Sequence, residues 1–384
     1  MRKLVLLGIL FLLSGIAGAQ SPFNSPDLVI YPFWDFYAEN KLSATNAGKG
    51  NTGVASENDL SGITLNPASF EPASKFQVIG SYEIKSSVPW YVFSSDAYLK
   101  SIHPTVLAGA GFKINEYFSA GLVYSNQNSF KLDLGEIIMT NEFGQITGLT
   151  TAYERYSTNN FTVPLVYKSK YFKAGVKLNA IWYKGFTRYG DTDNRQFSTS
   201  FWKFVPALGI ITSPTETFSF GLTYSPSYKQ NIEWTSLDGS YTYNYNTTNY
   251  YPATFSAGTE FKFIDKRLIF DLDYHFANTS INPAMKDRHD INFGVQYSVI
   301  PDLTLRTGFF TSRDYRDGNN YIEEVGTYNT YFLTFGGTYK YKGYSLSMSL
   351  INGDLIRTTT VSHTRLGMTV SYDFGCKQDC NMKH

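Results

Sequence analysis

Long hydrophobic runs are missing from most of this chain of 384 residues. After residue 19, no uninterrupted apolar stretch reaches the length of about eighteen residues that a helix needs to cross a bilayer. This absence excludes a protein built from several membrane-spanning helices. It leaves open a closed β-barrel, because helices and closed barrels are the two structures that satisfy all their backbone hydrogen bonds inside lipid.

Charge is also scarce and nearly balanced. Charged residues make up 17% of the chain and the net charge is +1, so the basic excess that favours nucleic acid as a partner is missing. Aromatic residues are abundant instead, with 30 Tyr and 30 Phe. This composition favours an aromatic-rich β protein over a typical soluble domain.

Motifs for catalysis and for cofactor binding are absent. The sequence contains no G-x-S-x-G elbow, no H-E-x-x-H pair and no glycine-rich phosphate loop, and its five His residues are scattered. His275 with Asp271 and Asp273 could form an acid/base cluster, but we favour the interpretation that these residues are polar groups lining a wet lumen. We therefore expect no enzyme, no catalytic residue and no cofactor.

Cysteine is nearly absent, and the two that occur, Cys376 and Cys380, lie in the tail GCKQDCNMKH. A disulfide between them suits an oxidising compartment, whereas a metal site that also uses His384 is the alternative. We expect a structural or incidental role for the pair and no metal site.

The first nineteen residues, MRKLVLLGILFLLSGIAGA, have the pattern of a secretory signal. Arg2 and Lys3 precede a short apolar core, and Ala17 and Ala19 have the spacing of a signal peptidase site. We interpret residues 1–19 as a cleaved signal peptide. A permanent membrane anchor is the alternative, which the shortness of the apolar core disfavours.

Apolar and polar residues alternate in the segment RLGMTVSYDF, residues 365–374. Side chains alternate across a β-strand, so Leu366, Met368 and Val370 share one face while Arg365 and Thr369 share the other. The pattern recurs and predicts about fourteen strands, an even number whose lengths suit a tilted crossing of the hydrocarbon layer. The predicted strands are 76–85, 104–113, 117–126, 161–170, 171–183, 204–213, 217–226, 253–263, 266–276, 291–300, 302–312, 331–341, 344–353 and 365–374.

The connections between these segments alternate between short and long, as in outer-membrane barrels with short periplasmic turns and long outer loops. Tight turns are predicted at residues 114–116, near 169, and at 213–216, 264–266, 300–302 and 342–344; the longest outer loops are predicted at 129–159, 185–198, 231–251 and 314–330. Residues 90–100 also resemble a strand, which would make the count odd, and we assign them to the first outer loop. The Tyr-rich loop 241–252 has two interpretations, capture of an amphipathic ligand or a structural rim.

The segment before the barrel lacks alternation but is too apolar for a disordered tail. A barrel of fourteen strands encloses more space than its own side chains fill, so we expect residues 20–74 to form a plug, or hatch, inside the lumen. The fold class predicted is therefore all-β: a transmembrane antiparallel β-barrel over residues 75–374, with a hatch at 20–74 and a C-terminal periplasmic tail at 375–384.

The hatch segment carries the residues of a family resemblance. A Gly-containing stretch, ATNAGKGNTGVAS, is followed by Glu57 and Asp59 and then by TLNPASF directly before the first strand. This order resembles the FadL/TodX family of outer-membrane transporters for long-chain fatty acids and other hydrophobic compounds. The stretches VPLVYKSKYFKAGVKLNAIWYKG and ATFSAGTEFKFIDKRLIFDLDYHF are similar to strand, turn, strand units of that family, and the resemblance covers essentially the whole mature chain.

The resemblance implies a fourteen-stranded barrel whose hatch contains Asn66, Pro67 and Ala68. It also implies that ligands are captured at the outer loops, pass to a lumen pocket and leave sideways through a gap beside a kinked strand. Ser69 stands where the family usually has Gly, and SNQNSF follows the third strand where members often have Pro and Gly. The implied location is the bacterial outer membrane, and the implied partners are fatty acids or hydrocarbons, outer-membrane lipid and the barrel assembly machinery.

The lumen face predicted by the alternation is largely charged. Inward apolar residues are exceptions there, and together with the aromatic residues of the hatch and with Arg306 as a partner for a carboxylate head group they make up the candidate ligand-binding residues. The alternative for any inward charge is compensation by a neighbouring charge. The candidates are Phe33, Trp34, Phe36, Ile181, Arg306, Phe310 and Phe332.

Three functions fit these features. Passive uptake of hydrophobic compounds such as long-chain fatty acids, gated by the hatch, is favoured. A protein-interaction or secretion-system role, as in PorV-like barrels that resemble this family, is the alternative. A general porin for hydrophilic solutes comes third, because a filled lumen opposes it.

Overall fold

The computed structural model describes residues 43–57, 59–72, 74–89, 98–126, 129–140, 146–189, 195–238, 241–282, 285–315, 329–356 and 362–374. The predicted signal peptide, the first part of the predicted hatch with Phe33, Trp34 and Phe36, and the tail with Cys376 and Cys380 lie outside these residues. Among the residues described, no helix is both long enough and apolar enough to span a membrane.

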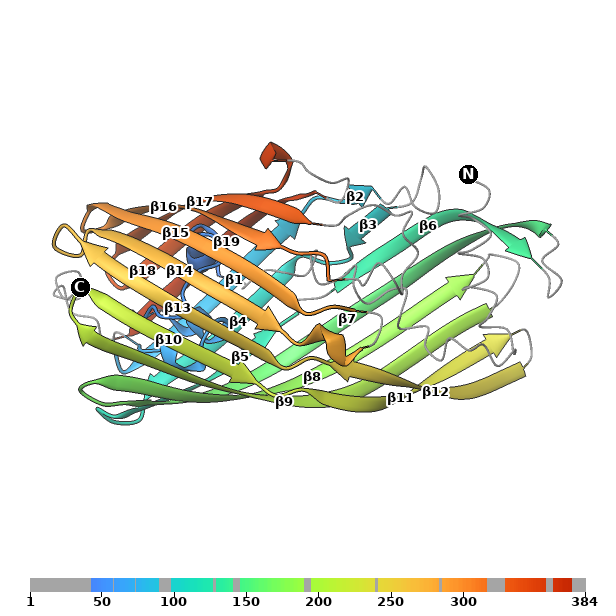
Figure 1. Ribbon diagram of the computed structural model, residues 1–384, viewed down its shortest axis with the longest axis horizontal. Helices are drawn as coiled ribbons and strands as arrows, with labels where there is room; N and C mark the ends of the chain where they lie inside the picture. The colour runs from blue at the N-terminus through green and yellow to red at the C-terminus, as the bar shows by residue number, and fades with distance from the viewer. Residues whose placement is uncertain are drawn as a thin grey trace.

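The described strands close into one antiparallel barrel of fourteen strands (Figure 1). Each barrel strand pairs with the next, and the last strand, β19, pairs with the first, β1, from Phe76 opposite Phe374 to Lys85 opposite Arg365. The barrel strands are β1 (Phe76–Lys85), β4 (Thr105–Lys113), β5 (Phe118–Ser125), β7 (Ile146–Lys168), β8 (Phe172–Tyr189), β9 (Arg195–Thr215), β10 (Phe218–Ser225), β13 (Thr254–Phe263), β14 (Leu268–Ala277), β15 (Arg288–Ile300), β16 (Leu303–Ser312), β17 (Thr330–Tyr341), β18 (Tyr344–Asn352) and β19 (Thr364–Phe374).

All fourteen predicted strands are present at their predicted places, and the last one ends at Phe374 as expected. The six predicted tight turns are confirmed as well, because each lies in a short connection between barrel strands or at its edge. One of them uses Lys342 and Gly343, which both have positive φ angles of 48° and 85°, as a two-residue hairpin turn requires.

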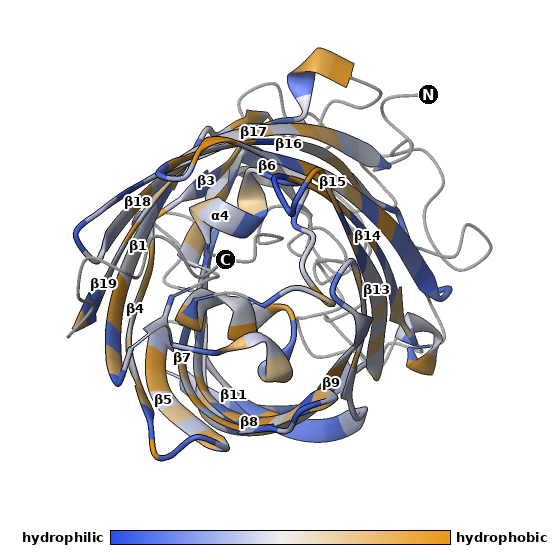
Figure 2. Cartoon of the chain, turned by 90° about the vertical axis from the view of Figure 1, so that its left-hand side faces the viewer, coloured by the Kyte–Doolittle hydropathy of each residue, from blue (hydrophilic) through white to orange (hydrophobic). Residues whose placement is uncertain are grey.

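The apolar stripe of each strand faces outward. Leu366 and Met368 of β19 are 51% and 42% exposed, whereas Arg365 and Thr369 on the other face are 1% and 2% exposed. The hydropathy colouring in Figure 2 follows the same alternation around the ring of strands. An unbroken apolar outer surface of this kind fits hydrocarbon and not water.

The prediction of long outer loops is partly wrong, because much of the length of these connections forms β-strands. β7, β8 and β9 continue beyond the other barrel strands to lengths of 23, 18 and 21 residues (Figure 1). The predicted loop 241–252 is mostly strand β12 (Tyr241–Tyr251), paired along its length with β11 (Tyr228–Asp238). These extensions are rich in Asn, Thr and Tyr, so their two faces differ little in hydropathy. The alternation of apolar and polar residues that predicted the other strands is therefore absent from them.

Residues 90–100 do not add a barrel strand among the described residues. The short strand β3 (Tyr98–Ser101) pairs with β2 (Val88–Pro89) and with β6 (Ser129–Thr140), at the same end as the extensions. Residues 90–97 lie outside the described residues. The number of barrel strands therefore stays even.

Residues 43–72 lie within the ring of strands (Figure 2). They include α4 (Ala44–Ala47) and two 3-10 turns, η1 (Leu60–Thr64) and η2 (Pro67–Ser69), and most of their side chains are buried. Two further short 3-10 turns, η3 (Thr279–Ile281) and η5 (Asp354–Ile356), belong to the outer connections. Many polar side chains in residues 43–52 and 59–69 are buried against the wall. Buried polar groups need hydrogen-bond partners, which the wall must supply.

Placing a charge on the outer face tests the orientation of the barrel. Met348 is 60% exposed at the middle of β18, so we expect Met348→Arg to lower the free energy of unfolding by about 2–4 kcal/mol in a bilayer. Leu355→Arg is the matched control, because Leu355 is 65% exposed but lies in η5 beyond the strands. Urea titrations of both variants in lipid vesicles measure the difference, and equal effects would contradict a lipid-facing outer surface.

Candidate functional site

Glycines leave the inner wall without side chains where residues 43–72 pack against it. Four cross-strand glycine pairs face this segment: Gly111 with Gly121, Gly175 with Gly209, Gly221 with Gly258, and Gly294 with Gly308. A Cβ atom at Gly221 would lie 2.1 Å from the Val54 carbonyl oxygen, and one at Gly308 would lie 2.3 Å from the Gly50 nitrogen. The segment therefore packs against the strand backbones themselves, which side chains on the wall would prevent.

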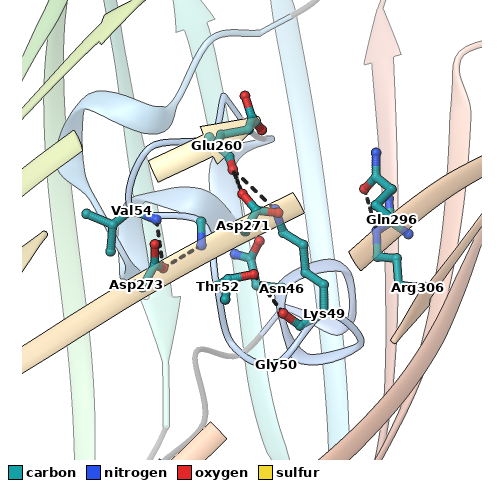
Figure 3. Close-up of polar contacts among 12 residues, drawn as sticks. Asn46, Lys49, Gly50, Thr52, Val54, Glu260, Asp271, Asp273, Gln296 and Arg306 are labelled. Atoms are coloured by element: carbon teal, nitrogen blue, oxygen red, sulfur yellow. Dashed lines mark hydrogen bonds and ion pairs between the residues drawn. The ribbon is translucent and has the colours of Figure 1, made fainter. Parts of the chain in front are cut away.

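Two buried carboxylates of β14 bind the first part of the segment (Figure 3). The Asp271 carboxylate accepts hydrogen bonds from Lys49 Nζ at 2.9 Å and from Ser56 Oγ at 2.6 Å. The Asp273 carboxylate accepts from the backbone N–H groups of Gly53 and Val54 at 2.7 and 3.1 Å. Charge-assisted bonds of this kind are the stronger ones available inside a protein.

His275 lies on the same face of β14 as these two carboxylates. Its Nδ1 atom is 2.8 Å from Ser256 Oγ, whereas Asp271 and Asp273 are both engaged by residues 49–56. The arrangement gives the two aspartates a structural task, the attachment of an inner segment, in place of the acid/base cluster considered above.

Neutral side chains of three other strands complete the attachment. The Gly50 N–H donates to Thr334 Oγ1 at 2.8 Å, the Ala44 N–H to Thr369 Oγ1 at 2.9 Å, and the Leu60 N–H to Gln77 Oε1 at 2.9 Å. These threonines and this glutamine belong to β17, β19 and β1. The wall thus supplies acceptors for backbone groups that no helix or sheet satisfies.

Asn66, the first residue of the predicted Asn-Pro-Ala motif, is fully buried between the segment and the wall. Its side-chain oxygen accepts from the Ala68 N–H at 2.9 Å and so caps η2, which has Pro67 at its first position. Its amide nitrogen donates to the carbonyl oxygens of Val54, Ile210 and Leu222. One side chain therefore links the segment to both β9 and β10.

The end of the segment is held by charges near the short turns. Lys173 binds Glu57 at 2.7 Å and also contacts Glu71, and Lys168 contacts Glu71 as well. Burial raises the pKa of the Glu71 carboxyl, but the charges and hydrogen bonds of Lys173 and Lys168 outweigh burial and lower it to about 2. Glu71 is therefore ionised at neutral pH and ties residues 57–72 to β7 and β8.

Apolar side chains hold another part of the segment. Leu60, Ile63 and Phe70 of the segment pack on inward side chains of β1, β4, β5 and β7, in a buried cluster completed by Ile79, Leu107, Val123 and Val166. Glycines of β4 and β5 again bring the segment close, because a Cβ at Gly111 would lie 2.3 Å from the Phe70 ring. This cluster is not among the candidate residues predicted from the sequence. A signal was available, because Ile79, Leu107 and Val123 are apolar at inward positions that are otherwise mostly polar.

The hydrogen-bonded ladder is interrupted beside this cluster. The β5–β7 pairing runs from Phe118 to Ala120 and resumes at Val123, so Gly121 and Leu122 have no paired partner opposite Val163 and Pro164. Proline has no N–H to donate, which explains a local loss of pairing. A Cβ at Gly121 would lie 3.0 Å from Leu60 Cδ1, so the interruption lies directly over the apolar face of the segment.

Phe310 and Phe332 point inward as expected and are almost fully buried. Their rings stack with centroids 4.6 Å apart and join Ala47 and Ile351 in a second apolar cluster. Arg306 donates to Gln296 Oε1 and Thr338 Oγ1, so its described contacts are neutral groups of the wall. Ile181 is half-buried on β8, paired with Lys203, and the structure does not bring these four candidates into one cluster.

Inward aromatic rings line the outer part of the barrel, and two of them, Phe130 and Tyr156, lie in the predicted loop 129–159. Phe130, Tyr156, Tyr183 and Phe201 contact one another in series, with successive centroid distances of 5.8, 6.0 and 4.8 Å. These four rings come from β6, β7, β8 and β9 in turn, and we call them the aromatic ladder. Within the part of the chain that the structure describes, no group of His, Cys, Asp and Glu side chains is arranged to hold a metal.

Solved structures of known proteins share this architecture. The Ralstonia pickettii toluene transporter TbuX matches with a TM-score of 0.64 at 14% identity, covering 86% of this chain and 97% of that one. A Pseudomonas aeruginosa FadL homologue matches with a TM-score of 0.64 at 13% identity, covering 86% and 98%. The Pseudomonas putida toluene transporter TodX matches with a TM-score of 0.59 at 15% identity, covering 86% and 97%.

No protein-family model and no curated protein matches the sequence. At these identities the structural matches demonstrate a shared fold, and the predicted resemblance to FadL/TodX proteins is confirmed at that level. TbuX and TodX are both named as toluene transporters. The closed barrel with its apolar outer face is the architecture of bacterial outer-membrane proteins.

Substituting an inner-wall glycine tests the packing of residues 43–72. In Gly308→Val the new side chain overlaps Gly50, so we expect overpacking to cost about 1–3 kcal/mol and to raise the population of displaced segment about tenfold or more. The reporter is Ala55→Cys, a buried position, labelled with a water-soluble maleimide in a chain whose Cys376 and Cys380 are replaced by Ser. Gly80→Val is the control, because a Cβ there meets no atom within 4 Å, and equal labelling in both variants would refute the packing argument.

The lowered pKa of Glu71 predicts a pH dependence. A carboxyl whose pKa is lowered from 4.5 to about 2 contributes stability above pH 4.5 and loses it as the pH falls toward 2. We expect Glu71→Gln to destabilise the protein at pH 7 by up to about 3 kcal/mol and to flatten the stability profile between pH 5 and pH 2, measured by urea unfolding. Glu216→Gln, which breaks an exposed pair with Lys266, should leave both the stability at pH 7 and the pH profile close to those of wild type; similar effects of both substitutions would contradict the assignment.

Proposed function

We propose that this protein is an outer-membrane channel for the passive uptake of hydrophobic compounds such as long-chain fatty acids or hydrocarbons. The observation that carries the proposal is the apolar cluster around Leu60 and Phe70, which lies beside the interruption of the ladder between β5 and β7. A hydrophobic path that ends at an interruption of the wall suits a molecule that dissolves better in lipid than in water. The neighbours TbuX and TodX are named toluene transporters, which supports the same class of cargo.

Capture begins at the outer end of the barrel. The β11–β12 hairpin exposes Tyr241 and Tyr243, whose rings present an apolar body with a polar tip to an arriving amphipathic molecule. The aromatic ladder follows on the inner side of the neighbouring strands and offers apolar surface for the next part of the route. Aromatic rings suit this task because they bind both acyl chains and planar hydrocarbons without a directional requirement.

The hatch is assigned to residues 20–74, with Asn66, Pro67 and Ala68 fixing its second half to β9 and β10. Its attachment is uneven, and this favours a gating role. Among the described residues, the side-chain amides of Asn46 and Asn51 are buried without a hydrogen-bond partner, and each such group costs about 1–3 kcal/mol. A hatch held by some strong and some unsatisfied contacts opens more readily than the surrounding barrel.

Release is assigned to the wall between β5 and β7. Gly121 and Pro164 leave a place without ladder hydrogen bonds and with little side-chain bulk, directly outside Leu60. A small shift of η1 would connect the apolar cluster with the surrounding lipid. The kinked strand that the resemblance implied is assigned to β5, the third barrel strand, and the proline opposite the interruption lies on β7, the fourth.

The remaining candidates have subordinate tasks. Phe310 and Phe332 pack against Ala47 and are assigned to positioning the hatch, whereas Ile181 is assigned to the wall of the route. Arg306 keeps its assignment as partner of a carboxylate head group, because its described hydrogen bonds go to neutral acceptors. Phe33, Trp34 and Phe36 stay candidates in the hatch outside the described residues.

The domain assignment completes the proposal. Residues 1–19 are the cleaved signal peptide, residues 75–374 the barrel and residues 375–384 a periplasmic tail. Export of this kind requires the barrel assembly machinery as a partner during biogenesis and outer-membrane lipid as the permanent surroundings. No cofactor and no nucleic acid takes part.

Uptake of labelled oleate by liposomes tests the proposal. We expect protein-containing liposomes to take up oleate several-fold faster than empty ones, and Gly121→Phe to reduce the rate about tenfold because its ring fills the space between Leu60 and Pro164. Gly80→Phe is the matched control, since it adds the same ring where no atom lies within 4 Å.

Heat-modifiable migration of each variant confirms that the barrel is folded before its rate is compared. Equal rates with and without the protein would remove the transport function and favour the PorV-like protein-interaction role. Equal rates in wild type and Gly121→Phe would remove the sideways exit and leave transport intact.

A further inference from the structure

Side chains on the outer faces of β7, β8 and β9 lie in rows across the strands. Toward the outer end of the barrel these rows change from apolar to aromatic and then to basic. The strand register defines the rows, because residues opposite one another on antiparallel strands lie side by side. Val163, Leu178 and Pro206 form one row, and Phe161, Ala180 and Phe204 form the next. Both rows belong to the apolar surface, with Leu178 and Phe204 exposed.

The next row marks the edge of the apolar surface. Trp182 and Trp202 stack with centroids 5.9 Å apart, next to Asn159, and the Trp182 indole N–H donates to Ser200 Oγ at 2.9 Å. Tryptophan with its ring on the apolar side and its N–H satisfied on the polar side is typical of the membrane–water interface. The level of the head groups therefore begins beyond this row.

Four basic side chains lie in the rows beyond the two tryptophans. Lys184 follows directly, with its Nζ 4.0 Å from the Trp182 ring centroid. Arg155 and Lys131 are opposite each other on β7 and β6, and both lie over the Tyr153 ring at 5.0 and 4.6 Å. Arg188 is opposite Tyr153 and so belongs to the same patch.

These side chains point outward, away from the lumen. Their neighbours in sequence point inward and are buried, as Glu154 and Tyr156 are beside Arg155, Tyr183 is beside Lys184, and Thr187 is beside Arg188. Arg155 and Lys184 are exposed. Successive rows are about 6.8 Å apart along a strand, so the three basic rows fit within the depth of a layer of lipid head groups.

Acidic groups compensate only part of this charge. Asp133 binds Lys131 at 2.6 Å, and exposed Glu136 lies opposite Thr151 in the next row outward. Glu233 of β11 lies on the same outer face, two strands away from Lys184 through Ser200. Arg155, Lys184 and Arg188 have no ion pair among the described residues that lie in these rows. An anionic partner with phosphate groups matches this excess, because guanidinium groups bind phosphate bidentately and ammonium groups add charge.

We propose that Lys131, Arg155, Lys184 and Arg188 bind the phosphate groups of the phosphorylated glycolipid in the outer leaflet of the outer membrane. The long connections place this end of the barrel at the cell exterior, where that glycolipid is the lipid in contact with the strands. Its acyl chains lie against Phe161 and Phe204, its sugar rings against Trp182 and Trp202, and its phosphates in the basic rows. The site is separate from the route assigned to cargo, since it lies on the outer face of the same strands.

Native mass spectrometry of the folded, detergent-solubilised mature chain tests this site. The probes are diphosphoryl lipid A and the same lipid with both phosphates removed. We expect the diphosphoryl form to bind at least about tenfold more tightly, and the triple variant Arg155→Gln, Lys184→Gln, Arg188→Gln to lose that difference. Lys170→Gln is the matched control, because Lys170 also lies over a tyrosine ring, that of Tyr171, but at the opposite end of the barrel.

Equal affinity of wild type for the two lipids, or wild-type affinity in the triple variant, would overturn the proposal. If the triple variant does not fold, the single variant Lys184→Gln and the comparison of the two lipids on wild type decide the same question. Oleate uptake by these variants should equal that of wild type, so failure of the lipid site and failure of the transport function give different results.

Discussion

The space inside a fourteen-stranded barrel is the constraint on which this structure depends. Such a wall encloses more volume than its own side chains fill, and an aqueous channel is the result unless something else occupies the space. Here the wall carries glycine where residues 43–72 lie, so backbone packs against backbone and the segment occupies the lumen with few side chains between. Glycine destabilises a strand through its conformational entropy, but at these positions any larger residue would prevent the close approach of the segment to the wall.

Different parts of the segment are held by different forces. Asp271 and Asp273 of the wall and Glu71 of the segment attach it through charges and hydrogen bonds, whereas the side chains of Leu60, Ile63 and Phe70 pack against apolar side chains of the wall. Polar attachment is directional and fixes a position, while apolar packing tolerates small displacements.

The spanning part of the barrel was predictable because its strands face two different solvents. An apolar stripe against lipid and a polar stripe against the lumen give the period of two that marks residues such as Leu366 and Arg365, and tight turns fix the register between strands. The outer parts of β7, β8, β9 and β12 face water on at least one side and carry Tyr, Thr and Asn, so the same period gives no contrast in hydropathy. Their strand structure was therefore missed.

The candidate site was predictable only in part, for a related reason. The buried Asn66 and the inward positions of Phe310 and Phe332 followed from motif and alternation. The apolar cluster required knowing that strands β1, β4, β5 and β7 are neighbours around Leu60, which depends on contacts distant in sequence. Pro164 was visible in the sequence, but its effect on the ladder depends on the strand that lies opposite.

Backbone hydrogen exchange followed by mass spectrometry tests most directly whether residues 43–72 are docked inside the barrel. The N–H groups of Gly50, Gly53 and Leu60 donate to wall side chains of three strands, Thr334, Asp273 and Gln77, and not to any helix or sheet. Docking predicts that these amides exchange as slowly as those of the barrel strands. Exchange at the rate of an unstructured chain, with the strands protected, would contradict the account.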